Sequence, residues 1–269
     1  MKGFLRFCAE RFRLKKVANI GEKHMLAYVE HRHAQGVAEK TIKEDLSAIR
    51  FFHRFSGSKT KLPDNREFGI TKTATDGKDR TWTDKEYNQM MEEAERLGRH
   101  DVVLSLRIAR LAGLRIHECI RLTFGQLQNG LENGEFNVTG KGGLVRSVPV
   151  TESLKAVFIE ILDGRSSNRE DKIFLVKEGE AHKAIKRVQK FLYRHRKKFT
   201  ARNVTAHGLR HVFAARQYER ELDRAWEAGF RGKKLVREAK LRVAKLLGHG
   251  RPEVTDIYIK HTKVKKDAT

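Results

Sequence analysis

Apolar residues recur at intervals of three and four along most of this chain, and this periodicity limits its fold more than any other feature. The pattern is typical of amphipathic helices and is clear at 22–33, 41–55, 101–112 and 182–199. Residues 136–138 and 144–150 alternate instead, as strands do, and the Gly-Lys-Gly-Gly run between them suits a tight turn. We therefore expect a mainly α-helical protein with one small β-hairpin.

The helical pattern fails between residues 56 and 81, where Gly, Ser, Thr and Pro punctuate the sequence as in a linker. A new helix is predicted after this stretch, because Thr83 followed by Glu86 resembles a capping box. A chain of 269 residues with 39% apolar content commonly divides into two domains. We expect a small helical domain with its linker at 1–75 and a larger domain at 76–269.

The composition is strongly basic, with 57 Lys and Arg against 34 Asp and Glu, a formal net charge of +23 and a pI near 10.2. The excess is spread over both halves of the chain, which favours a protein that wraps a polyanion. Cys8 and Cys119 stand alone without metal-ligand spacing, so we expect neither a disulfide scaffold nor a metal site. No apolar run approaches the ~20 residues that span a bilayer, and we expect a cytoplasmic protein.

The predicted helix at 182–199 is the most basic one. Ala184, Val188 and Phe191 share one side of it and leave its cations for solvent or phosphate. We expect DNA contacts from Lys183, Lys186, Arg187, Lys190 and Arg194, together with Lys43 and Arg50 of the first domain. A solvated charged face explains any single one of these residues equally well.

The run His207-Gly-Leu-Arg-His211 has the strongest local geometry. Thr205 is a suitable N-cap, so His207 falls in a first helical turn, where free amide groups favour an anion. His207, Arg210 and His211 would share one helix face, opposite an apolar face, and we expect this trio to point away from the core. Taken alone, the trio also fits an ordinary exposed face of an amphipathic helix.

Two more cations lie in suitable settings for phosphate. Arg115 follows a helix that ends at Gly113, and Glu118 three residues later either forms a plain ion pair with it or holds its guanidinium toward a phosphate. Lys141 lies in the predicted hairpin turn, either as a solvated side chain or as a mobile proton donor. The residues around it do not match a nucleotide-binding P-loop.

His249 and Tyr258 complete the set. Tyr258 lies near Val254 and Ile257 at helical spacing, so it either packs on an apolar face or serves as a nucleophile. A phenol with an ordinary pKa near 10 needs a neighbouring base and cations before it attacks phosphorus. His249 follows an apolar helix and either ends it or hydrogen-bonds a phosphate oxygen.

At these residues the chain resembles the tyrosine recombinase family, which includes the phage integrases and the Xer-type enzymes. Residues 113–118 resemble the first arginine box of the family and residues 207–211 its second box. Leu247-Gly-His249, followed nine residues later by Tyr258, resembles the nucleophile segment, and Lys141 matches the hairpin lysine. The resemblance covers essentially the whole chain.

The resemblance implies that Tyr258 attacks DNA to give a 3′-phosphotyrosyl link and a free 5′-hydroxyl, without a metal or cofactor. It implies a helical SAM-like core-binding domain and a mostly helical catalytic domain that close on duplex DNA as a C-shaped clamp. Four protomers would assemble on two sites, a dimer on each, with accessory DNA-bending or directionality proteins as further partners. The implied catalytic residues are Arg115, Lys141, His207, Arg210, His249 and Tyr258, supported by Glu118 and His211.

We expect a site-specific DNA recombinase, the integrase of a mobile element. An Xer-like resolvase or invertase would use the same residues. A catalytically idle DNA-binding protein and a basic RNA-binding or structural protein are the alternatives from other classes. The charged stretch 219–240 is longer than the family pattern requires, and the sequence assigns it no role.

Overall fold

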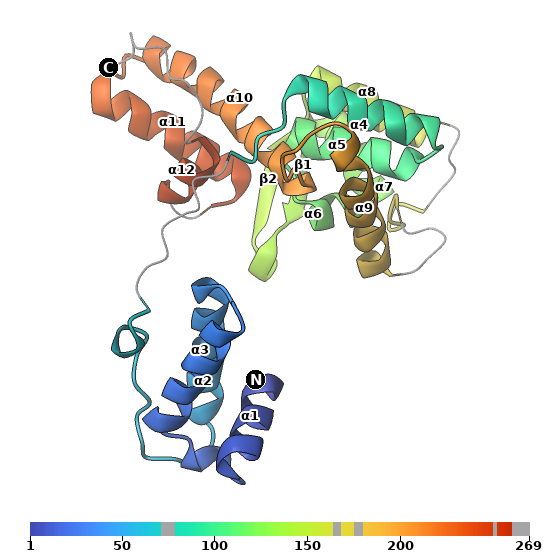
Figure 1. The fold of residues 1–269 in the computed structure, drawn as a ribbon. Coiled ribbons are helices and arrows are strands. Elements are labelled where there is room, and N and C mark those ends of the chain that lie inside the picture. Colours follow the sequence, from blue (N-terminus) through green and yellow to red (C-terminus); the bar gives the residue numbers. More distant parts are fainter. Residues whose placement is uncertain (71–78, 164–167, 175–179, 250–251, 260–269) are drawn as a thin grey trace. The chain divides into compact units, whose positions relative to one another are not determined.

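The computed structural model describes residues 1–70, 79–163, 168–174, 180–249 and 252–259. The chain separates into two compact units, Met1–Lys78 and Asp79–Thr269. Figure 1 shows the elements of each unit, coloured from blue at the N-terminus to red at the C-terminus. Each unit has a hydrophobic core of its own, and we describe the two separately.

The first unit is helical, as the sequence predicts. Its α-helices are α1 (Lys2–Phe12), α2 (Glu22–Ala34) and α3 (Glu39–His53). Two short 3-10 helices complete it, at Val17–Asn19 and Arg66–Phe68. Leu62 and Ile70 of the expected linker are buried in this core beside Ile42 and Leu46, so the described part of that segment packs on the first unit.

The second unit is also mainly helical. Its α-helices are α4 (Asp84–Arg96), α5 (His100–Ala112), α6 (Ile116–Ile120), α7 (Phe124–Asn133), α8 (Glu152–Leu162), α9 (Ala181–His195), α10 (Ala206–Glu227), α11 (Gly232–Leu247) and α12 (Glu253–Ile259). The predicted hairpin is confirmed: β1 (Glu135–Thr139) pairs antiparallel with β2 (Val145–Pro149), and a 3-10 turn at Lys141–Gly143 joins them. The expected fold class, mainly α with a small sheet, is therefore confirmed.

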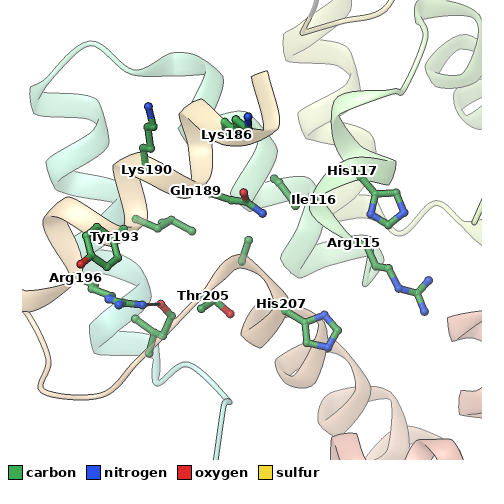
Figure 2. Close-up of a pocket in the computed structure, with 13 residues that line it drawn as sticks. Arg115, Ile116, His117, Lys186, Gln189, Lys190, Tyr193, Arg196, Thr205 and His207 are labelled. Atoms are coloured by element: carbon green, nitrogen blue, oxygen red, sulfur yellow. Dashed lines mark hydrogen bonds between the residues drawn. The ribbon is translucent and has the colours of Figure 1, made fainter. Parts of the chain in front are cut away.

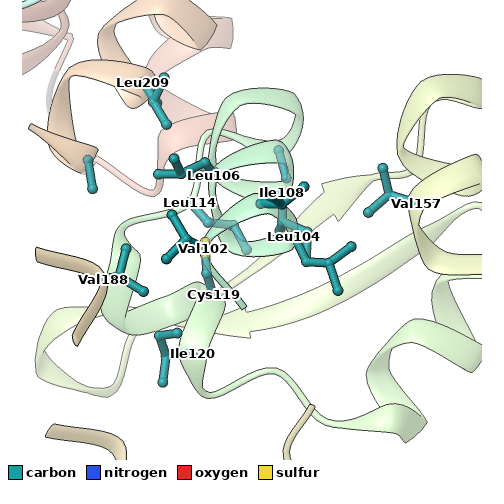
Figure 3. Close-up of a cluster of buried hydrophobic side chains, with 14 of the residues drawn as sticks. Val102, Leu104, Leu106, Ile108, Leu114, Cys119, Ile120, Val157, Val188 and Leu209 are labelled. Carbon is teal, nitrogen blue, oxygen red and sulfur yellow. The ribbon is translucent and has the colours of Figure 1, made fainter. Parts of the chain in front are cut away.

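Two hydrophobic clusters organise the second unit, and α10 belongs to both. The larger cluster surrounds α5, whose side chains lie between Val157 of α8, Val188 of α9 and Leu209 of α10 (Figure 3). The smaller cluster begins at Phe213 and joins the rest of α10 to α11 and α12. The initial turns of α10 are thus held by one core and its later turns by the other.

The charged stretch 219–240 is built into this second cluster. It forms the end of α10 and the first half of α11, and its apolar residues Leu222, Ala225, Leu235 and Ala239 are buried there. Glu221 is also buried and pairs with Arg224 and Arg242. The stretch therefore extends the pair formed by α10 and α11. The other end of this pair carries candidate site residues, Arg210 in α10 and His249 just after α11.

Close backbone packing positions the start of α10. A Cβ at Gly208 would lie 2.2 Å from the carbonyl oxygen of Arg80 and 2.7 Å from the Trp82 ring. Trp82 also donates a hydrogen bond from Nε1 to the Thr205 carbonyl, at 2.8 Å. The segment that contains Arg80 and Trp82 therefore packs closely against the first turn of α10, which carries His207.

Among the described residues, no helix combines the length and apolar character needed to cross a membrane. The same part of the chain holds no group of three or more His, Cys, Asp and Glu residues placed to bind a metal ion.

Candidate active site

Arg210 is the most deeply buried cation of the site, with no exposed surface. Its guanidinium donates hydrogen bonds to the carbonyl oxygens of Gly113, after α5, and Leu247, at the end of α11. Its Nη2 also lies 3.2 Å from Nε2 of His249. Arg210 thus connects three segments far apart in sequence, and burial lowers its pKa to about 10.

The expectation that His207, Arg210 and His211 all point away from the core is wrong for two of them. His207 is exposed, whereas Arg210 and His211 are buried. Helical spacing places the three on one side of α10, but α12 packs against α10 there and Tyr258 covers His211. A buried guanidinium is tolerated because backbone carbonyls accept its hydrogen bonds.

Tyr258 lies at the centre of these side chains. Its ring centroid is 4.5 Å from that of His211, 5.1 Å from that of His249 and 5.7 Å from that of His207. The Arg210 guanidinium carbon lies 5.7 Å from the centre of the Tyr258 ring. Tyr258 is 8% exposed and belongs to the apolar cluster of α10–α12. The same side chain therefore packs in a core and contacts the three histidines.

Glu118 is a buried carboxylate that gathers the arginines. It accepts a hydrogen bond of 2.9 Å from the Arg115 guanidinium and another of 2.9 Å from the Arg115 backbone. Arg146 of β2 donates two more, at 3.1 and 2.7 Å, and an Arg210 nitrogen lies 3.9 Å away. Burial by itself would raise the pKa of Glu118, but these hydrogen bonds and charges outweigh it and lower the pKa to about 2.

Arg146 is part of this group and was missed by the sequence analysis. It occupies an inward position of the hairpin, opposite Val138. Its Cδ lies 2.8 Å from where a Cβ would project at Gly248, so its stem fills the space beside the end of α11. An arginine at an inward position of an alternating strand needs a buried partner, which was the available signal.

His249 follows Gly248, whose left-handed conformation (φ 66°) ends α11. Burial and then the charges of Arg210, Arg115 and Arg146 lower the pKa of His249 to about 4. Burial and nearby positive charge likewise lower the pKa of His211 to about 4. His207 keeps part of its surface exposed, but partial desolvation of its ring and the charges of Arg210 and Arg115 lower its pKa below the usual value. All three imidazoles are therefore neutral near pH 7.

Lys141 lies in the turn between β1 and β2, as the sequence predicts. Its side chain lies outside the described part of the structure. The adjoining Gly140 is close to the arginine group, because a Cβ there would lie 3.4 Å from Oε1 of Glu118. The hairpin therefore begins its turn beside the site.

A cavity of about 520 Å³ opens next to Arg115 and His207 (Figure 2). The side of α9 that carries Lys186, Lys190 and Tyr193 forms its opposite wall. His117, Gln189, Tyr193 and Arg196 line it too, and the sequence analysis singled out none of them. Gln189 and Tyr193 occupy exposed positions of the basic helix, which was the available signal for those two.

The expected DNA-contact residues fall into distinct settings. Lys186 and Lys190 face the cavity, whereas Lys183 pairs with Glu180 and Arg187 pairs with Asp101. Arg194 lines a smaller cavity of about 220 Å³ with Arg99 and Arg187. In the first unit Lys43 is half-buried, and Arg50 donates hydrogen bonds to the Pro63 carbonyl and to Asn65.

Comparison with known proteins identifies the family. Residues 80–226 match the profile of the Phage integrase family, and residues 1–59 match that of its N-terminal SAM-like domain. The chain belongs to the phage integrase family, the tyrosine recombinases. The resemblance read from its sequence motifs is thereby confirmed.

Curated relatives of this chain carry Xer names. It is 26% identical to tyrosine recombinase XerD of Halalkalibacterium halodurans, over 98% of this chain and 85% of that protein. It is 25% identical to tyrosine recombinase XerA of Pyrococcus furiosus, over 88% of this chain and 75% of that protein. The likeness therefore extends through both units.

Solved structures agree on the fold. The Tn1549 transposon integrase in complex with transposon right end DNA is 16% identical, with a TM-score of 0.66 over 99% of this chain and 89% of that chain. A lambda integrase dimer bound to a core site is 17% identical, with a TM-score of 0.63 over 98% of this chain and 90% of that chain. The chain thus shares the fold of these two integrases.

Proposed function

We propose that this recombinase cuts and rejoins duplex DNA at a specific site, with Tyr258 as the nucleophile and the integration of a mobile element as its role. One observation carries the proposal. The Tyr258 ring lies among His207, His211, His249 and the Arg210 guanidinium, while Glu118 holds Arg115 beside them.

The chemistry follows from the protonation states. Neutral His207 accepts the proton of the Tyr258 hydroxyl as the phenol oxygen attacks phosphorus. Arg115 and Arg210 hold the non-bridging oxygens, and His249 donates a hydrogen bond to one of them. The bond from phosphorus to the 5′-oxygen breaks, and Lys141 protonates that oxygen.

In this step a phosphotyrosyl ester replaces the phosphodiester bond of DNA. The free energy of the broken bond is therefore retained in the new ester and is available for rejoining. The attack of the free 5′-hydroxyl on the 3′-phosphotyrosyl link reverses it. Positive charge on the arginines stabilises the transition state, so the proposed reaction requires neither a metal ion nor ATP.

The two units would divide the work of binding. We assign the core-binding role to residues 1–75 and catalysis to residues 76–269, with the two closing on duplex DNA as a C-shaped clamp. A dimer on each site and a tetramer on two sites would carry out strand exchange, with accessory DNA-bending or directionality proteins where needed. A net charge of +23 supports extensive phosphate contact.

The names of the curated relatives favour a second role. The XerD and XerA likenesses support an Xer-like resolvase or invertase with the same chemistry. The likeness in fold to a transposon integrase and to lambda integrase supports the mobile-element role. The DNA site that the protein selects separates the two.

The test is covalent capture on a partly randomised, nicked duplex library in EDTA. We expect wild-type protein to form an SDS-resistant, protease-sensitive adduct, because the nick lets the 5′ fragment leave before rejoining. Tyr258→Phe removes the attacking oxygen and should abolish the adduct. The control is Tyr87→Phe, because Tyr87 of α4 also has an arginine, Arg110 of α5, over its ring. This variant should retain the adduct. Duplex binding without any adduct would instead support a catalytically idle DNA-binding protein.

A further inference from the structure

The cavity beside Arg115 and His207 is suited to an anion. The residues that line it include four permanent cations and no carboxylate: Arg115, Lys186, Lys190 and Arg196. Apolar side chains and the neutral polar groups of Gln189, Tyr193 and Thr205 complete its lining. A ligand that presents both phosphates and flat base edges matches this combination.

The α9 wall is one regular helix face. Lys186, Gln189, Lys190 and Tyr193 are spaced three, four and seven residues apart and therefore lie together. Ala184, Val188 and Phe191 are buried on the other side, which anchors the helix in the larger core. Figure 2 shows the cavity-facing side chains on this helix, with Arg115 and His207 across from them.

Gln189 is a neutral amide between two lysines on this helix face. It is exposed, and within the described part of the chain neither its amide nor the ammonium groups of Lys186 and Lys190 have a hydrogen-bond or ion-pair partner. Lys183 and Arg187, at other positions of the helix, are paired with carboxylates. An amide flanked by two unpaired cations is suited to read a base while the cations hold the backbone.

We propose that Gln189 is a specificity-determining residue that recognises an adenine in the major groove, close to the phosphate held by Arg115 and His207. The proposal rests on the function proposed above and deepens it by naming one base contact. An α-helix fits the major groove, and a glutamine amide pairs in a bidentate manner with N6 and N7 of adenine. Lys186 and Lys190, on either side, contact phosphates and contribute no base preference.

The experiment is a binding selection from a randomised duplex library, followed by sequencing of the bound DNA. It uses the full chain with Tyr258→Phe as background, so the result does not depend on cleavage. We expect one position of the selected site to prefer adenine roughly five- to hundredfold over the other bases. Gln189→Ala should remove that preference, and Gln189→Arg should shift it to guanine, which arginine pairs with at O6 and N7.

Lys186→Ala is the matched control, because it lies one turn away on the same exposed face. It should weaken binding to every sequence alike and lower the salt dependence of log K by about 0.9. Gln189→Ala should leave the salt dependence unchanged, since no phosphate contact is lost. Circular dichroism checks that the variants are folded.

The proposal is overturned if Gln189→Ala and Gln189→Arg select the same sequences as the background protein, or if they behave as Lys186→Ala does. That result leaves cleavage by Tyr258 unaffected. The reverse result, a Gln189-dependent adenine with no covalent adduct from the wild-type protein, refutes the proposed cleavage and supports this inference. The two failures are therefore distinguishable.

Discussion

At the scale of single residues, the site depends on one carboxylate among several guanidinium groups. Arg115, Arg146 and Arg210 repel one another where their charges are poorly screened, and Glu118 lies within hydrogen-bond distance of two of them and 3.9 Å from the third. Its negative charge makes their close approach favourable. Because the remaining charge is still positive, the group retains attraction for a phosphate.

Glu118→Gln should therefore destabilise the second unit by roughly 3 to 5 kcal/mol, since it leaves buried arginines without their counter-charge. The effect should depend on pH. The pKa of Glu118 is about 2 in the folded protein against an ordinary value of 4.5, so its stabilisation is complete above pH 4.5 and is lost as the pH falls toward 2. The linked loss amounts to about 3 kcal/mol.

Chemical unfolding between pH 7 and pH 2 measures this difference. Glu93, held by Arg96 and Lys198, also has its pKa lowered to about 2, but it titrates in both proteins and cancels in the comparison. Wild type and Glu118→Gln should converge in stability as the pH approaches 2. Parallel curves across the whole range would show that Glu118 does not stabilise the fold through its charge.

At the scale of elements, the end of α5 packs tightly against the first turns of α10. Gly113 ends α5 in the left-handed conformation, at φ 62°, and a Cβ there would lie 2.3 Å from the Phe213 ring. Its carbonyl accepts a hydrogen bond from Arg210. A single backbone position thus sets the distance between the helix that precedes Arg115 and the helix that carries Arg210.

Gly113→Ala should destabilise the protein by more than the roughly 1–2 kcal/mol that a left-handed alanine costs, because the new methyl group also displaces Phe213. Gly134→Ala is the matched control. Gly134 ends α7 at φ 72° with nothing within 4 Å of an added Cβ, so it should show the conformational cost alone. Denaturant unfolding of the two variants compares them, and equal losses would disprove tight packing at Gly113.

At the scale of the whole molecule, the chain consists of two units with separate cores. The first buries Phe4, Met25, Ile42 and Leu46 among others, and the second has the α5 cluster and the α10–α12 cluster. Positive charge is in excess over the whole chain. Both units would therefore gain stability when they bind a polyanion, in proportion to the phosphates each one contacts.

Residues 1–78 and 79–269 should each fold when expressed alone, because each unit retains its own core. At about 0.7 kcal/mol per residue, their unfolding enthalpies should be roughly 55 and 130 kcal/mol. Scanning calorimetry of both fragments and of the full chain measures this. A fragment without a cooperative transition would show that its core depends on the other unit.

The sequence by itself determined the local structure of this protein and pointed to most of the candidate site residues. Helical periodicity at 41–55, the capping box at Thr83 and the glycine-rich turn around Lys141 all depend on neighbours in the chain, and the structure confirms each element. The expected helix at 182–199 is confirmed as α9, followed by a short 3-10 turn.

Tertiary structure alone decided which side chains became buried and which partners they found. Arg210 is enclosed, Arg146 joins Glu118 from a distant strand, and Arg187 is neutralised by Asp101 while Lys186 remains free of ion pairs among the described residues. Each outcome depends on elements far apart in sequence. Periodicity specifies the face of a helix on which a residue lies, but burial and ion pairing depend on what packs against that face.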